Sequence, residues 1–503
     1  MTVCLIIPPS IFLLDERVFM TLGILKVAAV LEQGGIEVQM LDLSGIENYE
    51  DVVRDHAAAT DAKAFGLTAT TPQMPAVANI QRLLRTVRPD ARLVLGGPHV
   101  TLVHTAAKLE RAEGRRGRAA KALGDLSALF DVLVAGDGEE AVFLALADDA
   151  PGLIDADDPK SGLFLTNARL TELPLPARHL VDVDSYRYTI NGVRALSLIA
   201  QLGCPFACGF CGGRESPSLR RVRMRTTESV VGEIVALHRT YGVTGFMLYD
   251  DELNVNPKMI ELMNAIERAQ RELRTEFRLR GFIKAQLFTD AQAEAMYRAG
   301  FRWILTGFES GSPRILENIN KKATREENTL CVEIARRHGL KVKALMSIGH
   351  PGESEATILD THRWLLDAKP DDFDVTIITT YPGTPYYDQA VLHPTKPGVW
   401  TYTYAKTGDR LYAFEVDYMR VADYYKGDPD GGYQSFVYTE ALSPDDLVRL
   451  RDFVERDVRK RLGIPFNPAA PAVRYEHSMG QFGGALPRTI LRTTRGTSQP
   501  RPV

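Results

Sequence analysis

The stretch SLIAQLGCPFACGFCGGR, Ser197 to Arg214, holds three of the five cysteines in this chain of 503 residues. They are Cys204, Cys208 and Cys211, spaced C-x3-C-x2-C, and they follow an apolar run that predicts a strand. Small residues among them let the backbone approach a bulky ligand: Gly203, Pro205, Gly209, Gly212 and Gly213. Three thiolates are one short of the four ligands that close a structural zinc site. A four-iron cluster held by three cysteines instead leaves one iron open to another ligand.

Phe206 and Phe210 lie beside the last two cysteines, and the whole pattern resembles the signature of the radical S-adenosylmethionine (SAM) superfamily. The resemblance implies that the three cysteines hold a [4Fe–4S] cluster, with Phe210 and Gly212 in the same cofactor-binding loop. It also implies that the open iron chelates SAM and that an electron from the cluster splits SAM to a 5′-deoxyadenosyl radical. A zinc knuckle, or buried cysteines without metal, is the alternative.

Composition is that of a globular protein, with 45% hydrophobic and 25% charged residues. This length is enough for two or three domains. A net charge of −4 gives no electrostatic reason to expect nucleic acid or a membrane surface as partner. The basic cluster Arg111 to Lys121 is expected to be a solvated loop or helix face. Cys4 and Cys331 are expected in the core.

The first residues, MTVCLIIPPS, do not resemble a signal peptide, and no apolar run is long enough to span a bilayer. We therefore expect a cytoplasmic protein. A reducing compartment also suits an oxygen-sensitive cluster.

Residues 1 to 150 alternate strand-like and helix-like segments, which predicts an α/β domain with a doubly wound parallel sheet. The expected strands are Val3–Ile7, Ile36–Leu41, Ala64–Ala69, Leu93–Leu95 and Val132–Ala135. The expected helices are Leu22–Glu32, Asp51–Ala62 and Pro75–Val87. Such sheets bind ligands at the carboxyl ends of their strands. No G-x-G-x-x-G follows the first strand, so a dinucleotide site is not expected.

Three segments of this domain resemble the cobalamin-binding domain that precedes many radical SAM domains: Leu22–Asp42, Leu93–Thr101 and Ala135–Val142. The resemblance implies bound cobalamin, although some relatives keep the fold without it. The glycine turns at strand ends are the expected cofactor contacts: Gly96, Gly97, Gly136 and Gly138. The D-x-H-x-x-G motif that supplies an axial histidine in some cobalamin enzymes is absent. His99 is a candidate ligand, with a turn or capping role as the alternative.

Residues 151 to 193 are expected to be a linker, because the sequence from Asp148 is acidic and rich in proline and glycine. Residues 194 to 390 contain six strand-then-helix units, which predict a partial (β/α)6 barrel. The expected strands are Ala195–Leu202, Phe246–Asp250, Phe277–Phe282, Trp303–Phe308, Lys341–Ile348 and Asp374–Thr379. The helices between them begin near Thr227, Pro257, Asp290, Thr324 and Ser354. Chemistry belongs at the carboxyl ends of the strands in such barrels.

Two segments at strand ends, Phe301–Thr324 and Ile348–Ser354, are similar to radical SAM segments that hold SAM, and Tyr381–Asp388 resembles the close of the barrel in cobalamin-type members. Glu309 is expected to accept hydrogen bonds from the ribose or the ammonium, and Ser310 to donate to the carboxylate. The backbone at Gly349, Pro351 and Gly352 is expected to reach the adenine. The alternative for Glu309 is a salt bridge across the barrel mouth.

The candidate substrate contacts are Asp250, Asp251, His350 and Tyr381. The two aspartates are expected either to contact SAM or substrate or to cap a helix, and the sequence favours neither role over the other. His350 is a turn residue, a substrate contact or a proton carrier. Lys321 and Lys322 are expected to be a solvated pair at the start of a helix.

Residues 391 to 503 are expected to form a small α-rich region that caps the substrate site, ending in a disordered tail, Gly496–Val503. One helix is predicted, Pro444–Leu462, with acidic residues in its first turn and basic residues in its last. Tyrosines before it either line a substrate pocket or pack under the barrel: Tyr402, Tyr404, Tyr412 and Tyr418.

The resemblance implies methylation of an unactivated carbon of a small molecule of secondary metabolism. A radical removes the hydrogen and cobalamin delivers the methyl group, so the cofactors carry the chemistry. One alternative is dehydration, epimerisation or a ring-forming rearrangement, with cobalamin auxiliary or absent. Another is a non-catalytic iron–sulfur or corrinoid-binding protein. A flavodoxin or ferredoxin is expected as the electron donor.

Overall fold

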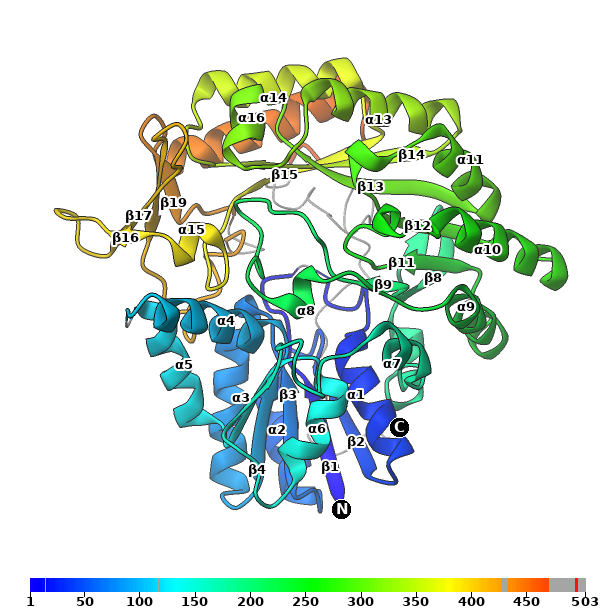
Figure 1. Ribbon diagram of the computed structural model, residues 1–503, viewed down its shortest axis with the longest axis vertical. Helices are drawn as coiled ribbons and strands as arrows, with labels where there is room; N and C mark the ends of the chain where they lie inside the picture. The colour runs from blue at the N-terminus through cyan, green and yellow to red at the C-terminus, as the bar shows by residue number, and fades with distance from the viewer. Residues whose placement is uncertain (14, 116, 428–431, 470–493, 496–503) are drawn as a thin grey trace.

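The computed structural model describes residues 1–13, 15–115, 117–427, 432–469 and 494–495. Figure 1 shows an N-terminal sheet domain below a curved half-barrel, with the C-terminal elements beside the half-barrel. The tail that we expected to be disordered lies outside the described residues. No helix among the described residues is long and apolar enough to cross a membrane.

The N-terminal sheet has six parallel strands in the order β2-β1-β3-β4-β5-β6, which confirms the doubly wound parallel fold. The strands are β1 Thr2–Ile7, β2 Glu37–Asp42, β3 Ala64–Thr68, β4 Arg92–Gly96, β5 Val132–Gly136 and β6 Leu153–Ala156. Strand β6 lies beyond residue 150, so the first sheet extends into the segment that we expected to be a linker. It pairs with β5 from Leu133 to Gly136, which makes it an edge strand of the sheet.

Helices cover both faces of this sheet, because alternate residues of a central strand are apolar on both sides. Val3, Leu5 and Ile7 share a core with α1 (Leu22–Gln33). Cys4 and Ile6 share the opposite core with the helices that follow β2, β3 and β4. These are α2 Tyr49–Ala59, α3 Met74–Val87, α4 Pro98–Ala112 and α5 Arg118–Leu129, and α6 Gly138–Leu146 packs beside α1.

The basic cluster between residues 111 and 121 contains the end of α4 and the start of α5, two helices that we did not predict. The carboxylate of Glu110 in α4 accepts hydrogen bonds from the backbone N–H groups of Gly117, Ala119 and Ala120. An acidic side chain therefore caps the start of α5, where the helix has unsatisfied N–H groups.

The second sheet curls into the predicted half-barrel, with the order β15-β14-β13-β12-β11-β8-β7. Its strands are β7 Thr189–Ile190, β8 Val193–Leu198, β11 Gly245–Leu248, β12 Arg278–Phe282, β13 Phe301–Glu309, β14 Lys341–Ile348 and β15 Asp372–Ile377. All neighbours are parallel except β7 and β8, which form a hairpin. Its turn, Asn191-Gly192, has positive φ at both residues (51° and 78°), as a type I′ turn requires.

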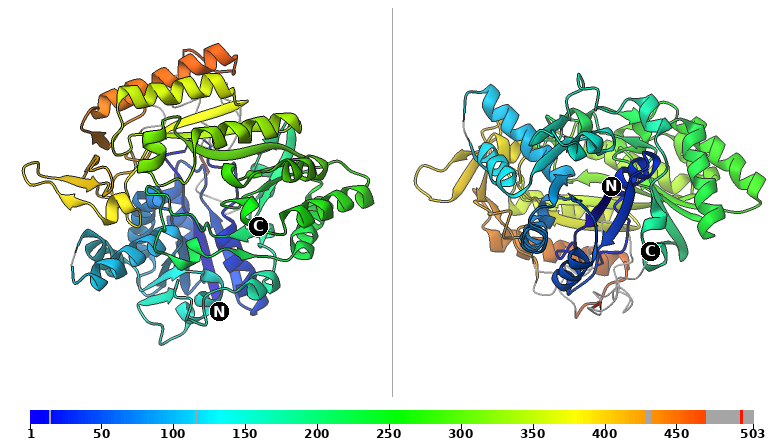
Figure 2. Two further views of the ribbon diagram at one scale, coloured as in Figure 1. Left: turned by 45° about the horizontal axis from the view of Figure 1, so that its top comes forward. Right: turned by 90° about the horizontal axis from the view of Figure 1, so that it is seen from below.

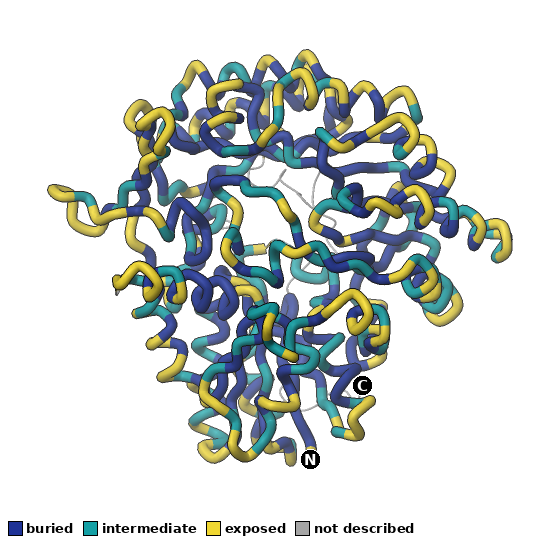
Figure 3. The backbone as a smooth tube through the Cα atoms, viewed as in Figure 1, coloured by how far each residue is buried: buried dark blue, intermediate teal, exposed yellow. Residues whose placement is uncertain are grey.

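Helices on the outer face follow the strands: α9 Thr227–Tyr241, α10 Met259–Leu273, α11 Asp290–Ala299, α13 Arg325–Arg337 and α14 Glu355–Ala368. The side chains of Thr226 and Thr289 cap α9 and α11, because each accepts a hydrogen bond from the first turn of its helix. Figure 3 shows buried strands in both sheets and exposed residues on the outer helices and turns.

The C-terminal region contains the predicted helix, α16 (Pro444–Leu462), and also a four-stranded antiparallel sheet that we did not expect. The strands are β16 Val391–Leu392, β17 Val399–Thr403, β18 Arg410–Phe414 and β19 Val437–Thr439. Tyr402 packs against Tyr386, and Tyr412 stacks on Tyr438 of the neighbouring strand, with ring centroids 4.7 and 4.8 Å apart. At least these two tyrosines therefore pack within the protein.

Helix α16 covers the open edge of the half-barrel (Figure 2, where it lies beside α14). The Arg451 guanidinium donates to the Val375 carbonyl (2.9 Å), and Glu455 accepts from the Val375 N–H (2.6 Å). Arg459, which we expected to complement the helix dipole, is fully buried and donates to the Phe373 carbonyl (2.5 Å). Charged side chains thus satisfy backbone groups that an edge strand leaves unpaired.

Candidate active site

The three cysteines of the motif lie on one loop, closed at its base by the antiparallel pairing of β9 (Gln201–Leu202) with β10 (Arg223–Met224). This cluster loop, residues 203–222, also contains the short helix α8 (Pro217–Arg220). The Cys204 N–H donates to the Leu219 carbonyl (3.0 Å), which folds the cysteines over α8. Cys208 is buried, Cys204 is partly buried and Cys211 is exposed, and all three are free thiols.

Donors from a neighbouring segment and from the loop itself hold the backbone of the cluster loop. The Ala207 carbonyl accepts from the Asn320 amide (2.7 Å) and the Arg214 guanidinium (2.5 Å). The Gly209 N–H donates to the Ile319 carbonyl (2.7 Å), so the loop lies directly against the chain between α12 (Pro313–Asn318) and α13. These contacts fix the backbone and leave the thiols free to bind a ligand.

The thiols fit an iron–sulfur cluster by the chemistry of the donor set. Burial raises the pKa of Cys204 to about 11 and that of Cys211 to about 12, with further upward shifts from nearby acidic groups. The thiols of Cys204 and Cys211 are therefore protonated at neutral pH until a metal displaces their protons. Among the described residues no group of three His, Cys, Asp or Glu side chains is placed to hold a single metal ion. A cluster needs thiolates around a larger space, because each cysteine binds a different iron.

The structure separates the roles of the two aspartates that follow β11. Asp250 is 2% exposed, and its carboxylate accepts from the backbone N–H groups of Ala200 (2.8 Å) and Gln201 (2.5 Å). Burial raises its pKa to about 7. Asp251 is exposed and accepts from the Gly203 N–H (3.1 Å). Both carboxylates hold the segment that leads to the cysteines rather than a helix start, and Asp251 keeps accessible surface beside the thiols.

Glu309, at the end of β13, has the left-handed φ of 66°, next to a register shift between β13 and β14. Its carboxylate binds the Lys321 ammonium (3.1 Å) and accepts from the Ser347 hydroxyl (2.8 Å). The salt bridge that we considered as an alternative is therefore present, and Lys321 is buried rather than solvated. A strained conformation at a non-glycine residue is frequent at functional sites.

His350 is fully buried behind Glu309. One ring nitrogen lies 2.8 Å from the Ser347 hydroxyl and the other lies 3.2 Å from the Tyr386 hydroxyl. Its ring also contacts the edge of Phe210 in the cluster loop, with centroids 5.3 Å apart. Burial lowers the pKa of His350 to about 4, so the ring is neutral at pH 7. His350 thus positions Ser347 and, through it, Glu309.

The remaining residues predicted for SAM make contacts with neighbouring elements. Ser310 is buried; its hydroxyl lies 3.1 Å from that of Thr361 and accepts from the Ser312 N–H (3.1 Å). The Pro351 carbonyl accepts from the Asn318 amide (2.8 Å), and a Cβ at Gly352 would lie 2.6 Å from the Asp409 carboxylate. Gly349 packs near Ile377 and Val437. Their roles at SAM remain predictions.

The carboxyl ends of the N-terminal strands face this loop, as Figure 1 shows for β1 and its neighbours. Asp157, just after β6, accepts from the Ser216 hydroxyl (2.7 Å) and the Ser218 N–H (2.8 Å) of the cluster loop. Asp137, just after β5, forms a buried ion pair with Arg223. The two domains therefore meet through the ligand-binding edge of one and the cysteine loop of the other.

Tyr381 and α4 enclose the loop from the side of the N-terminal domain. A Cβ at Gly212 would lie 3.0 Å from the Tyr381 ring and 3.5 Å from Leu102 of α4. The Gly213 N–H donates to the Gly383 carbonyl (3.0 Å). Tyr381 thus packs over the last cysteine of the motif, and burial raises the pKa of its hydroxyl. Contact between Tyr381 and a substrate remains a prediction.

The predicted cobalamin contacts lie at this edge, but packing accounts for several of them. A Cβ at Gly136 (φ 89°) would collide with the backbone of Asp157, and one at Gly97 (φ 93°) would lie 2.8 Å from the Ala69 nitrogen. Gly96 and Gly138 pack near Val134 and Val27. His99 is buried with one ring nitrogen 3.1 Å from the Thr71 hydroxyl, and burial lowers its pKa to about 3. Roles for these residues at cobalamin remain predictions.

Two charged residues at the mouth were missed. Burial raises the pKa of Glu252 to about 7, and Lys284 and Lys321 lie near enough to oppose that shift. Lys284 is buried, with its ammonium 4.4 Å from the centre of the Phe206 ring and 3.2 Å from the Lys321 carbonyl. Lys284 comes two residues after β12, so the rule that strand ends carry the chemistry would have found it.

Comparisons with known proteins agree with this arrangement. The B12 binding domain family matches residues 16–127 and the Radical SAM superfamily matches residues 198–365. An uncharacterized methyltransferase from Pyrococcus horikoshii is 27% identical over 411 residues, covering 78% of this chain and 83% of the relative. The anaerobic magnesium-protoporphyrin IX monomethyl ester cyclase from Cereibacter sphaeroides is 27% identical over 337 residues, covering 64% of this chain and 52% of the relative.

Two solved structures share the fold. The radical SAM methyltransferase TsrM from Kitasatospora setae, solved with cobalamin and a [4Fe–4S] cluster, superposes with a TM-score of 0.63 at 18% identity. That match covers 93% of this chain and 89% of TsrM. The cobalamin-dependent radical enzyme OxsB matches with a TM-score of 0.53 at 13% identity, covering 77% of this chain and 54% of OxsB. The chain belongs to the radical SAM superfamily and carries an N-terminal B12-binding domain, so its cofactors are a [4Fe–4S] cluster, SAM and cobalamin.

Proposed function

We propose that this protein is a cobalamin-dependent radical SAM methyltransferase that methylates an unactivated carbon of a small molecule. The observation that supports this most strongly is the direct contact between the two ligand-binding edges. Asp137 and Asp157, at the ends of N-terminal strands, bind Arg223 and Ser216, which both follow the cysteines in the chain. A substrate bound between these edges would be within reach of both domains.

When bound, the cluster and SAM supply a hydrogen-abstracting radical and cobalamin supplies the methyl group. The chain's own task is to orient these groups and keep water out. Asp251, Glu252 and Glu309 offer carboxylates for the ammonium and ribose of SAM. Lys284 offers a buried ammonium for the carboxylate of SAM, because within the described part of the chain one hydrogen bond and one ring contact engage it.

Phe19 and Tyr249 are proposed to line the substrate space on the half-barrel side. Tyr249 follows β11 and is 39% exposed, so its ring is accessible at the carboxyl end of that strand. The rings of Phe19 and Tyr249 have centroids 5.1 Å apart. The proposal also includes a flavodoxin or ferredoxin as electron donor and a cytoplasmic location, which suits an oxygen-sensitive cluster.

A ring-forming radical reaction is the second candidate, favoured by one observation. Relatives that match this chain include anaerobic magnesium-protoporphyrin IX monomethyl ester cyclases from Cereibacter sphaeroides and Rubrivivax gelatinosus. In that case the radical would act without methyl transfer. The chain spans only 52% and 63% of these two relatives, so their whole activity is not carried over to it.

Product analysis separates the two candidates without a known substrate. The reconstituted holoenzyme is incubated with methyl-labelled SAM and titanium(III) citrate in the absence of oxygen. Methyl transfer by a radical route predicts both S-adenosylhomocysteine and 5′-deoxyadenosine. Ring formation alone predicts 5′-deoxyadenosine without S-adenosylhomocysteine. Formation of neither product by a protein with an intact cluster would contradict both candidates.

A further inference from the structure

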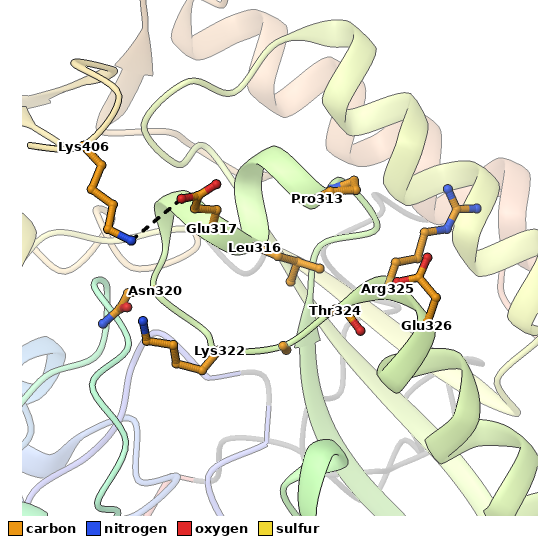
Figure 4. Close-up of a pocket in the computed structure, with 10 residues that line it drawn as sticks. Pro313, Leu316, Glu317, Asn320, Lys322, Thr324, Arg325, Glu326 and Lys406 are labelled. Carbon is orange, nitrogen blue, oxygen red and sulfur yellow. Dashed lines mark ion pairs between the residues drawn. The ribbon is translucent and has the colours of Figure 1, made fainter.

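A surface pocket of about 350 Å³ lies directly behind the cluster loop. Its walls come from α12, the start of α13 and the turn at Lys406, which follows β17. Figure 4 shows Lys406, Asn320 and Lys322 on one side and Arg325 and Glu326 on the other. Pro313, Leu316 and Ala323 give it an apolar part, so it combines an apolar centre with a charged rim, as protein interfaces do.

A hydrogen bond connects the wall of the pocket to the cluster loop. Asn320, in its wall, donates to the carbonyl of Ala207, the residue before Cys208 (2.7 Å). Asn320 and Lys322 both have left-handed φ values, 52° and 55°. This backbone directs Lys321 inward to Glu309 and leaves Lys322 exposed at the pocket. Left-handed lysine is uncommon, and such strain persists where the surrounding structure enforces it.

Positive charge gathers on this side of the cluster loop. Among the described residues, three cations there have no carboxylate partner, Lys322, Arg214 and Arg220, whereas Glu326 is a carboxylate of the same pocket wall. Arg214 and Arg220 donate to the Ala207 and Pro205 carbonyls instead. Lys406 is paired with Glu317 only at 3.8 Å, with both side chains largely exposed, which neutralises it weakly. The excess is local, since the whole chain carries a net charge of −4.

We propose that this pocket and the outer face of the cluster loop bind the acidic surface of a small electron-transfer protein of the flavodoxin or ferredoxin class. The inference rests on the proposed function, because it requires a cluster that must be reduced. One electron passes from the donor's low-potential cofactor to the cluster, and the donor is oxidised by one electron. The donor approaches beside the exposed Pro205, whereas substrate approaches from the space between the domains.

A docking site of this kind increases the association rate more than it increases affinity. Charge complementarity accelerates encounter and is screened by salt. We therefore expect reduction of the cluster by a protein donor to slow as ionic strength rises. Reduction by dithionite does not need the pocket and is not expected to depend on its charges.

The test is stopped-flow oxidation of flavodoxin hydroquinone by the reconstituted holoenzyme. The variant Lys322→Glu with Lys406→Glu reverses two exposed charges of the pocket wall. Lys369→Glu is a matched control, because Lys369 is also exposed with a left-handed φ (53°). The backbone carbonyl of Lys369 accepts a hydrogen bond from Arg336, at the end of α13 that is farther from the pocket. We expect the double variant to lower the second-order rate constant at low salt by about tenfold or more, and the control to change it less than about twofold.

Equal rates for wild type and double variant, or a wild-type rate independent of salt, would overturn the docking proposal. Dithionite-driven cleavage of SAM is measured on the same samples. If the double variant also loses that activity, the substitutions damaged the site itself, and docking is then tested with Lys322→Gln and the salt dependence of wild type. If wild type itself cleaves no SAM with dithionite, the proposed function fails, and the docking proposal fails with it.

Discussion

The cluster loop and the glycine turns of the N-terminal sheet use their residues in opposite ways. In the loop, donors such as Asn320 and Arg214 bind the backbone carbonyls, so the thiol side chains remain for the cofactor. In the turns, Gly97 and Gly136 are needed because neighbouring backbone lies against them. A cofactor held by side chains leaves a specific sequence motif. A cofactor that rests on strand ends leaves a pattern that packing alone can also produce.

The largest effect is expected from Cys208→Ser, which removes one of the three cluster ligands from the cluster loop. The cluster should be lost and SAM cleavage should fall to background, because three thiolates are the whole ligand set on this loop. Corrinoid binding should remain, since it belongs to the other domain. Iron content, corrinoid absorption and 5′-deoxyadenosine are measured on one sample. Retention of a full cluster in Cys208→Ser would contradict the assigned ligands.

The edge of the half-barrel depends on buried charges, whereas the first sheet ends in ordinary exposed strand residues such as Glu37. Glu455→Ala removes a fully buried carboxylate that binds the Val375 N–H and Arg459, leaving both without that partner. We expect the free energy of unfolding to fall by about 3–5 kcal/mol. Arg456→Ala, at the adjacent exposed position, should change it by less than about 0.5 kcal/mol. Urea denaturation measures the free energy of unfolding of both variants. A loss in Glu455→Ala as small as that in Arg456→Ala would mean that α16 does not stabilise the edge of the half-barrel.

The packing of the glycine turns can be tested at Gly136, where β5 ends beside the end of β6. Alanine there requires a positive φ and collides with Asp157, so we expect a loss of about 3 kcal/mol and weaker corrinoid binding. Gly35→Ala has a similar φ (74°) but open space around it, and should cost about 1 kcal/mol. The cluster content of both variants should match that of wild type. Equal costs at the two glycines would show that the close approach to Asp157 is unimportant.

A smaller effect should appear as a pH dependence through His350. Burial holds its folded pKa at about 4, below the ordinary value of 6.5, so the unfolded chain binds the extra proton between those values. The free energy of unfolding contributed by His350 should therefore fall by about 1.4 kcal/mol for each pH unit below about 6.5, down to about pH 4. The difference between wild type and His350→Gln isolates this slope. Parallel pH profiles would contradict a neutral, buried ring.

The regular elements of the half-barrel were predictable because local signals agreed with the tertiary structure. The bounds of β14 and α16 match the expected ranges at both ends. Helix α4 and strand β6 show the opposite case. We predicted no helix after Gly97, although proline at the first position favours a helix start, as Pro98 does in α4. We took the segment containing Asp157 as linker by composition, but its polar residues bind the cluster loop.

The site was predictable as a set of positions but not as a set of contacts. Strand-end reasoning identified Glu309, Asp251 and His350. It could not show that His350 is connected to Glu309 through Ser347, because these two hydrogen bonds depend on the register of neighbouring strands. Nor could it separate buried Asp250 from exposed Asp251, which are adjacent in the sequence and differ only in the direction of the side chain.

The central claim is that one chain brings a cluster and a corrinoid together. The most direct test is anaerobic purification and reconstitution with cobalamin, followed by iron content and the corrinoid absorption spectrum on the same sample. The account predicts about four irons and about one corrinoid per chain. A full cluster without corrinoid would contradict methyl transfer and favour the radical reaction without it. No cluster, with Cys204, Cys208 and Cys211 intact, would contradict the catalytic assignment as a whole.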